Sequence, residues 1–195
     1  MSKKKRKTLP QDPIEVEIES LSHDGRGIAH VEGKTVFVHG ALPGERVLFR
    51  YAKIRRQHDE GLASEGLKAS AQRVAPKCPH FGVCGGCSLQ HMEPGAQIGM
   101  KQGVLAEVLR RIGKVEPLEW LAPLCAEHWG YRRKARLGVR YVAKKGRVLV
   151  GFRERGTSYV ADLARCDVLH PEVGGRLRAI AGVVDALSIR ERVPQ

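Results

Sequence analysis

The chain has 195 residues, and its 34 Lys and Arg against 21 Asp and Glu give a net charge of +13. No apolar run approaches the roughly 18 residues of a membrane-spanning helix, and no apolar stretch follows the basic start as in a secretory signal peptide. We therefore expect a cytoplasmic protein without a membrane partner. The excess of positive charge favours nucleic acid as the binding partner.

The first part of the chain has the pattern of a small β domain. Residues 1–12 are predicted to form a disordered basic tail, and the apolar residues Ile14, Val16 and Ile18 alternate with Glu as in a half-buried strand. Four further short strands are predicted at residues 28–31, 35–38, 47–52 and 62–67. Turns separate them, including a hairpin turn at Glu32-Gly33. Five short strands within residues 13–71 predict a barrel of the OB type, a fold that commonly binds oligonucleotides.

The second part of the chain, residues 72–195, combines helices and strands. A helix is predicted from about Pro94 to Ile112, with Gly113 as its stop. Strands are predicted from about Arg133 to Tyr141, at 147–152 and at 157–161, and a second helix at 172–189. The fold class is therefore mainly β with helices (α+β), a five-stranded OB-like barrel followed by a small α+β domain.

The cysteines carry the strongest chemical signal in the sequence. The odd number of five argues against a disulfide framework, whereas Cys78, Cys84 and Cys87 lie within ten residues, as in metal sites. Gly85 and Gly86 allow the loop to wrap closely around a metal centre. Zinc and an iron–sulfur cluster both fit, and the single Cys-x2-Cys pair mildly favours the cluster. Four residues are candidates for the fourth ligand: Cys166, Cys125, His80 and His91.

A second basic group lies beside Trp129 and Tyr131 in the sequence. It consists of four residues: Arg132, Arg133, Lys134 and Arg136. Such a group can hold phosphates while an aromatic ring stacks on a base, and we predict that it contacts RNA. The alternative is a solvated strand face. Arg26 and His30 in the front domain are weaker candidates for the same role.

Several segments resemble one enzyme family. The stretch Cys78–Met92, with the sequence CPHFGVCGGCSLQHM, resembles the cluster loop of the bacterial RNA uracil-C5 methyltransferases. Segments that begin at Trp129, Gly151 and Cys166 resemble the parts that follow this loop in the family. The front domain, with DGRGIA at 24–29 and LPGERV at 42–47, resembles a TRAM domain.

The resemblance implies a [4Fe–4S] cluster held by Cys78, Cys84, Cys87 and Cys166. The family methylates a uracil at C5 with S-adenosylmethionine, after a cysteine thiolate adds to C6 of the base. The best-matching members act on 23S ribosomal RNA, which is the expected partner, and no obligate protein partner is expected.

The family's catalytic half contains a glycine-rich cofactor loop and the nucleophilic cysteine, and neither has a counterpart in these 195 residues. We therefore expect no catalytic residue and no S-adenosylmethionine site here, and predict that the chain alone is inactive. The alternative is a standalone RNA-binding protein with a structural metal or cluster site and no catalysis.

Overall fold

The computed structural model describes residues 9–187, which fall into two compact units. The first unit is formed by the chain up to Ala75 together with His91–Leu121. The second is formed by Pro76–Gln90 together with the chain from Ala122 onward. The first eight residues of the predicted basic tail and the last two of the predicted second helix lie outside the described residues.

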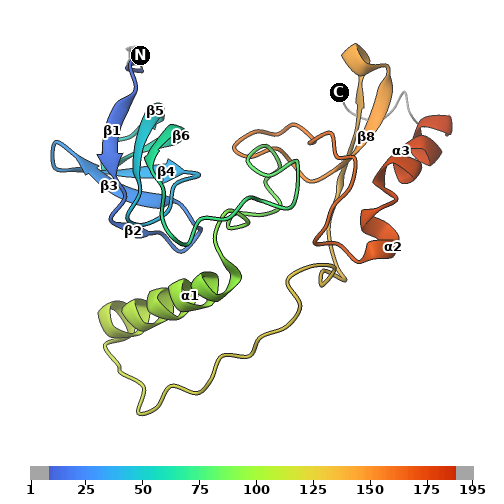
Figure 1. Ribbon diagram of the computed structural model, residues 1–195. Helices are drawn as coiled ribbons and strands as arrows, with labels where there is room; N and C mark the ends of the chain where they lie inside the picture. Colours follow the sequence, from blue (N-terminus) through green and yellow to red (C-terminus); the bar gives the residue numbers. More distant parts are fainter. Residues whose placement is uncertain (1–8, 188–195) are drawn as a thin grey trace, which may run out of the picture. The chain divides into compact units, whose positions relative to one another are not determined.

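A six-stranded sheet forms the body of the first unit (Figure 1). Its strands are β1 Ile14–Glu17, β2 Ser20–Leu21, β3 Gly27–Val31, β4 Lys34–His39, β5 Arg46–Ile54 and β6 His58–Lys68. Their order is β1-β5-β6-β4-β3-β2, and all neighbours are antiparallel except β4 and β6. The described strands therefore form one sheet with β1 and β2 as its edges. Their pairing does not show the closed barrel that the sequence predicts.

The predicted strand count is too low by one. The amide of Ile18 donates to Glu45 on one side, whereas the amide of Glu19 donates to Ile28 on the other. The run that begins at Ile14 therefore changes its partner from β5 to β3 and continues as the two-residue strand β2. Alternation of apolar residues cannot indicate such a change of partner.

Alternating apolar side chains build the core on one face of the sheet. The core residues are Val16, Ile18, Ala29, Val36, Val38, Ala41, Val47 and Phe49. Gly61 in β6 lies against the Phe49 ring, and a Cβ there would also meet the Arg50 carbonyl oxygen at 2.8 Å. The predicted hairpin turn at Glu32-Gly33 is confirmed, with positive φ angles of 51° and 78° that suit the twist of β3 and β4.

Helix α1 (Pro94–Val108) confirms the first predicted helix and continues as the π-helical turn η1 (Leu109–Gly113). Its first turn is capped by Glu93, whose Oε2 accepts from the amide of Ala96 at 2.7 Å. The predicted stop at Gly113 is wrong by one residue, because Lys114 takes the left-handed conformation that ends the helix.

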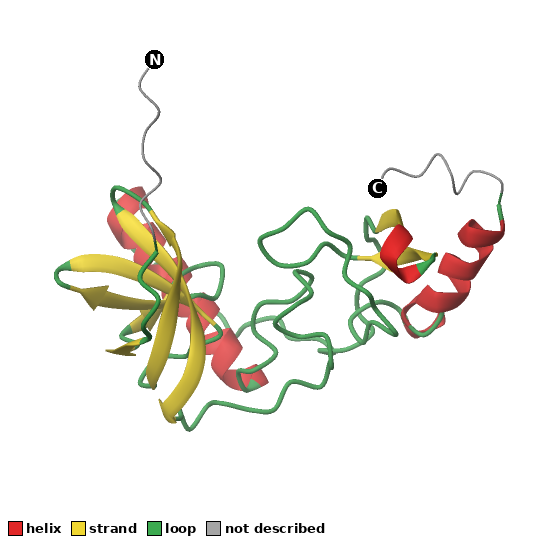
Figure 2. Cartoon of the chain, turned by 90° about the horizontal axis from the view of Figure 1, so that it is seen from above, coloured by secondary structure: helices red, strands yellow, loops and turns green. Residues whose placement is uncertain are grey.

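The second unit contains little regular structure, and most of it is loop (Figure 2). Its elements are β7 Gly138–Val142, the 3₁₀ turn η2 Ala143–Lys145, β8 Arg147–Gly151, α2 Pro171–Gly174 and α3 Leu177–Ala186. Strands β7 and β8 pair antiparallel, and Ala181 of α3 packs against Val148 and Val150 of β8.

Three predictions for this unit need correction. Residues 133–137 are not in a strand, which begins at Gly138. Residues 157–161 do not form a third strand. The chain folds back after Arg153 in a tight loop, and an isolated β-bridge pairs Val160 with Arg153. The predicted helix 172–189 is divided between α2 and α3, with a break at residues 175 and 176. None of the described helices has the length and apolar character needed to cross a bilayer.

A buried carboxylate ties the first unit together. The Glu45 side chain is 2% exposed, and its two oxygens accept hydrogen bonds from the amides of Leu42 (2.8 Å) and Ser70 (3.1 Å). The Arg73 guanidinium donates to the same carboxylate through Nε and Nη2, at 2.5 and 2.7 Å. Burial alone would raise the pKa of Glu45, but these hydrogen bonds hold the pKa below the ordinary value of 4.5.

Replacing this carboxylate should destabilise the first unit. We expect Glu45→Gln to lower the free energy of unfolding by about 2 kcal/mol, because the amides of Leu42 and Ser70 and the partly exposed guanidinium of Arg73 lose their charged acceptor. Since the pKa of Glu45 is lowered in the folded state, its contribution is full above about pH 4.5 and is lost as the pH falls through the folded value. Chemical denaturation of both proteins between pH 7 and pH 3 measures this.

The matched control is Glu15→Gln, which removes a carboxylate from the exposed ion pair with Arg46. It should cost less than about 1 kcal/mol. Equal losses in the two variants would mean that the Glu45 pair has no special role in the fold.

Candidate functional site

A pocket of the second unit gathers four of the five cysteines. The loop Pro76–Gln90 contributes Cys78, Cys84 and Cys87, and the segment before α2 contributes Cys166. All four are free and partly buried. The pocket wall also includes apolar side chains: Phe81, Phe152, Leu163 and Val168. The four thiols named from the family resemblance therefore line one pocket.

Main-chain contacts hold the cysteine loop against the segment that follows β8. The amide of Gly85 donates to the carbonyl of Arg153 (2.9 Å), and the amide of Arg155 donates to the carbonyl of Val83 (2.8 Å). The Arg155 side chain then reaches back, and its Nη2 donates to the carbonyl of Cys87 at 2.6 Å. These contacts fix the backbone on both sides of Cys84.

The two glycines between Cys84 and Cys87 permit this close approach. A Cβ on Gly85 would lie 3.0 Å from the carbonyl oxygen of Arg153, and one on Gly86 would lie 3.0 Å from the Phe152 ring. The amide of Gly86 also points to sulfur, with its nitrogen 3.4 Å from Sγ of Cys84. The glycine pair therefore allows the tight wrapping that the sequence predicts.

Cys166 is positioned by the last residue of α2, Gly174. Its amide donates to the carbonyl of Gly174 at 3.0 Å, and its own carbonyl lies where a Cβ of Gly174 would be. Only glycine fits at that place. Because α2 was expected to be part of one long helix, its contact with Cys166 was not predicted from the sequence.

The pocket is unfavourable for free thiolates. Burial raises the pKa of Cys78 and Cys84, and the neighbouring cysteines raise it further. Asp167 adds a negative charge beside Cys78, although it also pairs with Arg165, whose Nε lies 3.2 Å from Oδ1. A cation that binds these sulfurs has to displace their protons.

The other candidates for a fourth ligand lie outside the pocket wall. Cys125 is exposed. Nε2 of His80 accepts a hydrogen bond from the amide of Ala164 at 3.1 Å, and His91 is buried in the first unit. Among residues 9–187, no group of three or more His, Cys, Asp or Glu side chains is placed to hold a single metal ion.

The second basic group lies in irregular chain just before β7. Arg133, Lys134 and Arg136 are exposed. Arg132 is partly buried, because its guanidinium lies over the ring of Phe152, with 5.4 Å between Cζ and the ring centroid. The backbone at Arg132 is also fixed, since its amide donates to the carbonyl of Val168. Three of the four predicted RNA contacts are thus free to reach a ligand.

Sequence reasoning missed several residues of the pocket. Phe152, Arg165 and Asp167 line it, and Arg155 supports its loop. Asp167 could have been found from its place next to Cys166. For Arg155 the sequence holds no signal, because the contact with Cys87 depends on the fold-back of residues 153–160.

Residues 11–57 match the family model described as the TRAM domain. The chain is 54% identical over 191 residues to the 23S rRNA (uracil(1939)-C(5))-methyltransferase RlmD of Methylococcus capsulatus, and 55% identical over 192 residues to that of Nitrosococcus oceani. Each match covers 98% of this chain and 43% of the relative, so the chain spans less than half the length of these relatives.

One solved structure has a similar fold. It is the tRNA (uracil-54, C5)-methyltransferase of Pyrococcus abyssi in complex with S-adenosyl-L-homocysteine, with a TM-score of 0.56 and 23% identity. The match covers 91% of this chain and 37% of that one. Over nearly its whole length the sequence is therefore similar to part of the bacterial 23S rRNA (uracil-C5)-methyltransferases, and it contains a TRAM domain.

Proposed function

We propose that the chain is the RNA-recognition and [4Fe–4S]-binding part of a 23S rRNA uracil-C5 methyltransferase. The TRAM domain occupies residues 13–71 in this proposal, and the cluster-binding region occupies residues 72–195. The observation that carries it is the single pocket lined by Cys78, Cys84, Cys87 and Cys166. The identity of more than 50% with the enzymes from two bacteria supports the same activity.

The residues of the pocket fit an iron–sulfur cluster. Four cysteine thiolates are the usual ligand set, and backbone amides that point to sulfur, as at Gly86, are typical of such sites. When bound, the cluster supplies a rigid cross-link and a one-electron redox centre. Cys87 and Cys166 are 79 positions apart in the sequence, so the thiols would join two distant segments of the second unit.

The remaining parts of the proposal follow from the relatives. S-adenosylmethionine is the methyl donor, and we assign its binding to the part of the relatives that this chain does not match. The substrate is 23S ribosomal RNA in the cytoplasm. Within this chain, Arg132, Arg133, Lys134 and Arg136 contact RNA phosphates next to the aromatic side chains of Trp129 and Tyr131.

The metal content tests the cluster directly. Protein purified without oxygen should be brown and should hold about four irons and four sulfides per chain. We expect Cys166→Ser to lose most of this iron, because the variant removes the ligand that comes from the distant segment. Iron and sulfide assays, together with the visible absorption spectrum, measure the change.

Cys125→Ser is the matched control, since Cys125 is exposed and lies outside the pocket. It should keep the colour and the iron. Colourless protein with one zinc ion would contradict the cluster and would support a structural zinc site instead. Loss of iron in the control alone would contradict the ligand assignment.

RNA binding tests the basic group. The double variant Arg133→Gln/Arg136→Gln should bind RNA more weakly, because each phosphate contact releases counterions. The slope of log affinity against log salt should fall by about 0.7 for each lost contact with a single strand. Fluorescence anisotropy with a labelled 23S rRNA fragment at several salt concentrations measures both quantities.

Arg110→Gln/Arg178→Gln removes two other exposed charges and serves as the control. Its affinity should change little in comparison. Equal slopes for the two double variants would show that only the total charge matters, and the assignment of the contacts to residues 133 and 136 would then be wrong.

A further inference from the structure

The face of the first unit's sheet opposite the core carries a row of chemically distinct side chains. Val36 and Val38 point to the core, so Phe37 between them points to the other face. The register places Phe37 of β4 beside Ile28 of β3 and Glu60 of β6, and it places Glu60 beside Lys53 of β5. Four adjacent strands thus contribute to one continuous row, called the outer face below.

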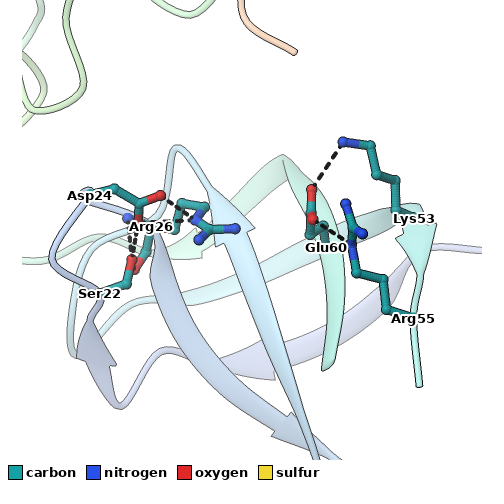
Figure 3. Close-up of polar contacts among 6 residues, drawn as sticks. All are labelled: Ser22, Asp24, Arg26, Lys53, Arg55 and Glu60. Carbon is teal, nitrogen blue, oxygen red and sulfur yellow. Dashed lines mark hydrogen bonds and ion pairs between the residues drawn. The ribbon is translucent and has the colours of Figure 1, made fainter. Parts of the chain in front are cut away.

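A guanidinium group is fixed over the aromatic ring at one end of this row. Cζ of Arg26 lies 4.3 Å from the centroid of the Phe37 ring. Asp24 holds the Arg26 Nε at 3.0 Å from Oδ1 and 2.9 Å from Oδ2, and Asp24 accepts a further hydrogen bond of 2.6 Å from Oγ of Ser22 (Figure 3). The guanidinium is therefore held in one orientation, and 19% of the Arg26 side chain remains exposed.

The ionised state of Asp24 supports this arrangement. Burial would raise the pKa of Asp24, but the hydrogen bonds from Ser22 and Arg26 and the charge of Arg26 lower it below its ordinary value of 3.8. The edge of the His58 ring meets the Phe37 ring at 5.3 Å between centroids and 80° between planes. The Arg26 guanidinium over the Phe37 ring therefore forms a stacked pair of planar groups, called the stacked platform below, and His58 meets Phe37 in an edge-to-face contact.

The other end of the row carries two cations on one carboxylate. Glu60 accepts from Nζ of Lys53 at 3.3 Å and from Nε of Arg55 at 3.0 Å (Figure 3). The Glu60 side chain is only 13% exposed, whereas those of Lys53 and Arg55 are about half exposed, at 52% and 51%. The carboxylate therefore positions both side chains and leaves one net positive charge facing solvent.

This combination suits an unpaired polynucleotide. Bases stack on aromatic rings and on guanidinium planes only when they are not paired within a helix, and phosphates pair with lysine and arginine. An acidic peptide would use the cations but not the planar platform. We propose that the outer face binds single-stranded RNA, with one base stacked on Arg26 above Phe37 and the adjoining phosphates held by Lys53 and Arg55.

This inference rests on the proposed function for the identity of the partner, and it adds the face of the protein and the unpaired state of the RNA. Any single-stranded segment of the substrate with a free base satisfies the same chemistry. The contact therefore predicts a preference for unpaired over duplex RNA that phosphate contacts alone would not produce.

The substitution Arg26→Lys tests the stacked platform, because it keeps the charge and removes the planar group. We expect it to weaken binding of a labelled oligouridylate of about ten nucleotides by about tenfold, which is typical of one lost base stack. Its affinity for a duplex of the same length should not change. Lys53→Gln should lower the salt slope for the single strand by about 0.7.

Lys101→Gln, on the exposed surface of α1, is the control for removing one charge and should leave the platform intact. Thermal unfolding of each variant identifies any loss of fold. A second measurement needs no variant: an oligonucleotide with 4-thiouridine, irradiated on the unaltered chain, should crosslink to the peptide that contains Phe37.

Two results would overturn the proposal. One is equal binding of the single strand by Arg26→Lys and the unaltered chain, and the other is crosslinking confined to peptides of the second unit. In both cases RNA binding by the unaltered chain would leave the proposed function standing. Absence of any RNA binding by the unaltered chain would instead contradict RNA recognition by this protein as a whole.

Discussion

The second unit depends on the meeting of its cysteine loop with the segment from Phe152 to Cys166. Its regular structure is small, a two-stranded sheet with one helix packed on β8, and two strands alone are marginally stable in water. The Gly85 amide donates to the Arg153 carbonyl, and the Ala164 amide donates to Nε2 of the His80 ring, so two hydrogen bonds join the segments. The four thiols lie where this junction forms, so the proposed ligands and the fold of the unit depend on the same contact.

This junction also explains why the local sequence has its composition. Glycine is needed where the loop passes the carbonyl of Arg153 and the ring of Phe152, and again at residue 174 beside Cys166. The cysteines are costly in a partly buried pocket as thiolates, because burial raises the pKa of Cys78 and Cys84. Such a group of side chains is stabilised when a metal centre replaces the protons, which is the physical basis of the proposed cluster.

Sequence patterns predicted the elements whose side chains alternate against a core, and they failed where a backbone contact decides the structure. The alternation from Ile14 predicted β1 but not the switch of partner that creates β2. Residues 157–161 alternate well enough for a strand, yet they fold back on residue 153 without a partner strand. The spacing in the sequence predicted that Cys78, Cys84 and Cys87 share one site. The choice of Cys166 among the four candidates for the fourth ligand depended on the family resemblance. The burial of Glu45 was not predicted, because its partner Arg73 is 28 positions away in the sequence.

The two groups of candidate RNA contacts differ in how much order they already have. Arg26 is held by Asp24 and packed on Phe37, so little side-chain freedom is lost when a base stacks on it. Arg133 and Arg136 are exposed in irregular chain, and binding has to order them. Preorganised planar groups discriminate between ligands, whereas mobile charges add attraction that depends on salt. We therefore expect the first unit to select unpaired RNA and the second unit's arginines to contribute mainly to overall affinity.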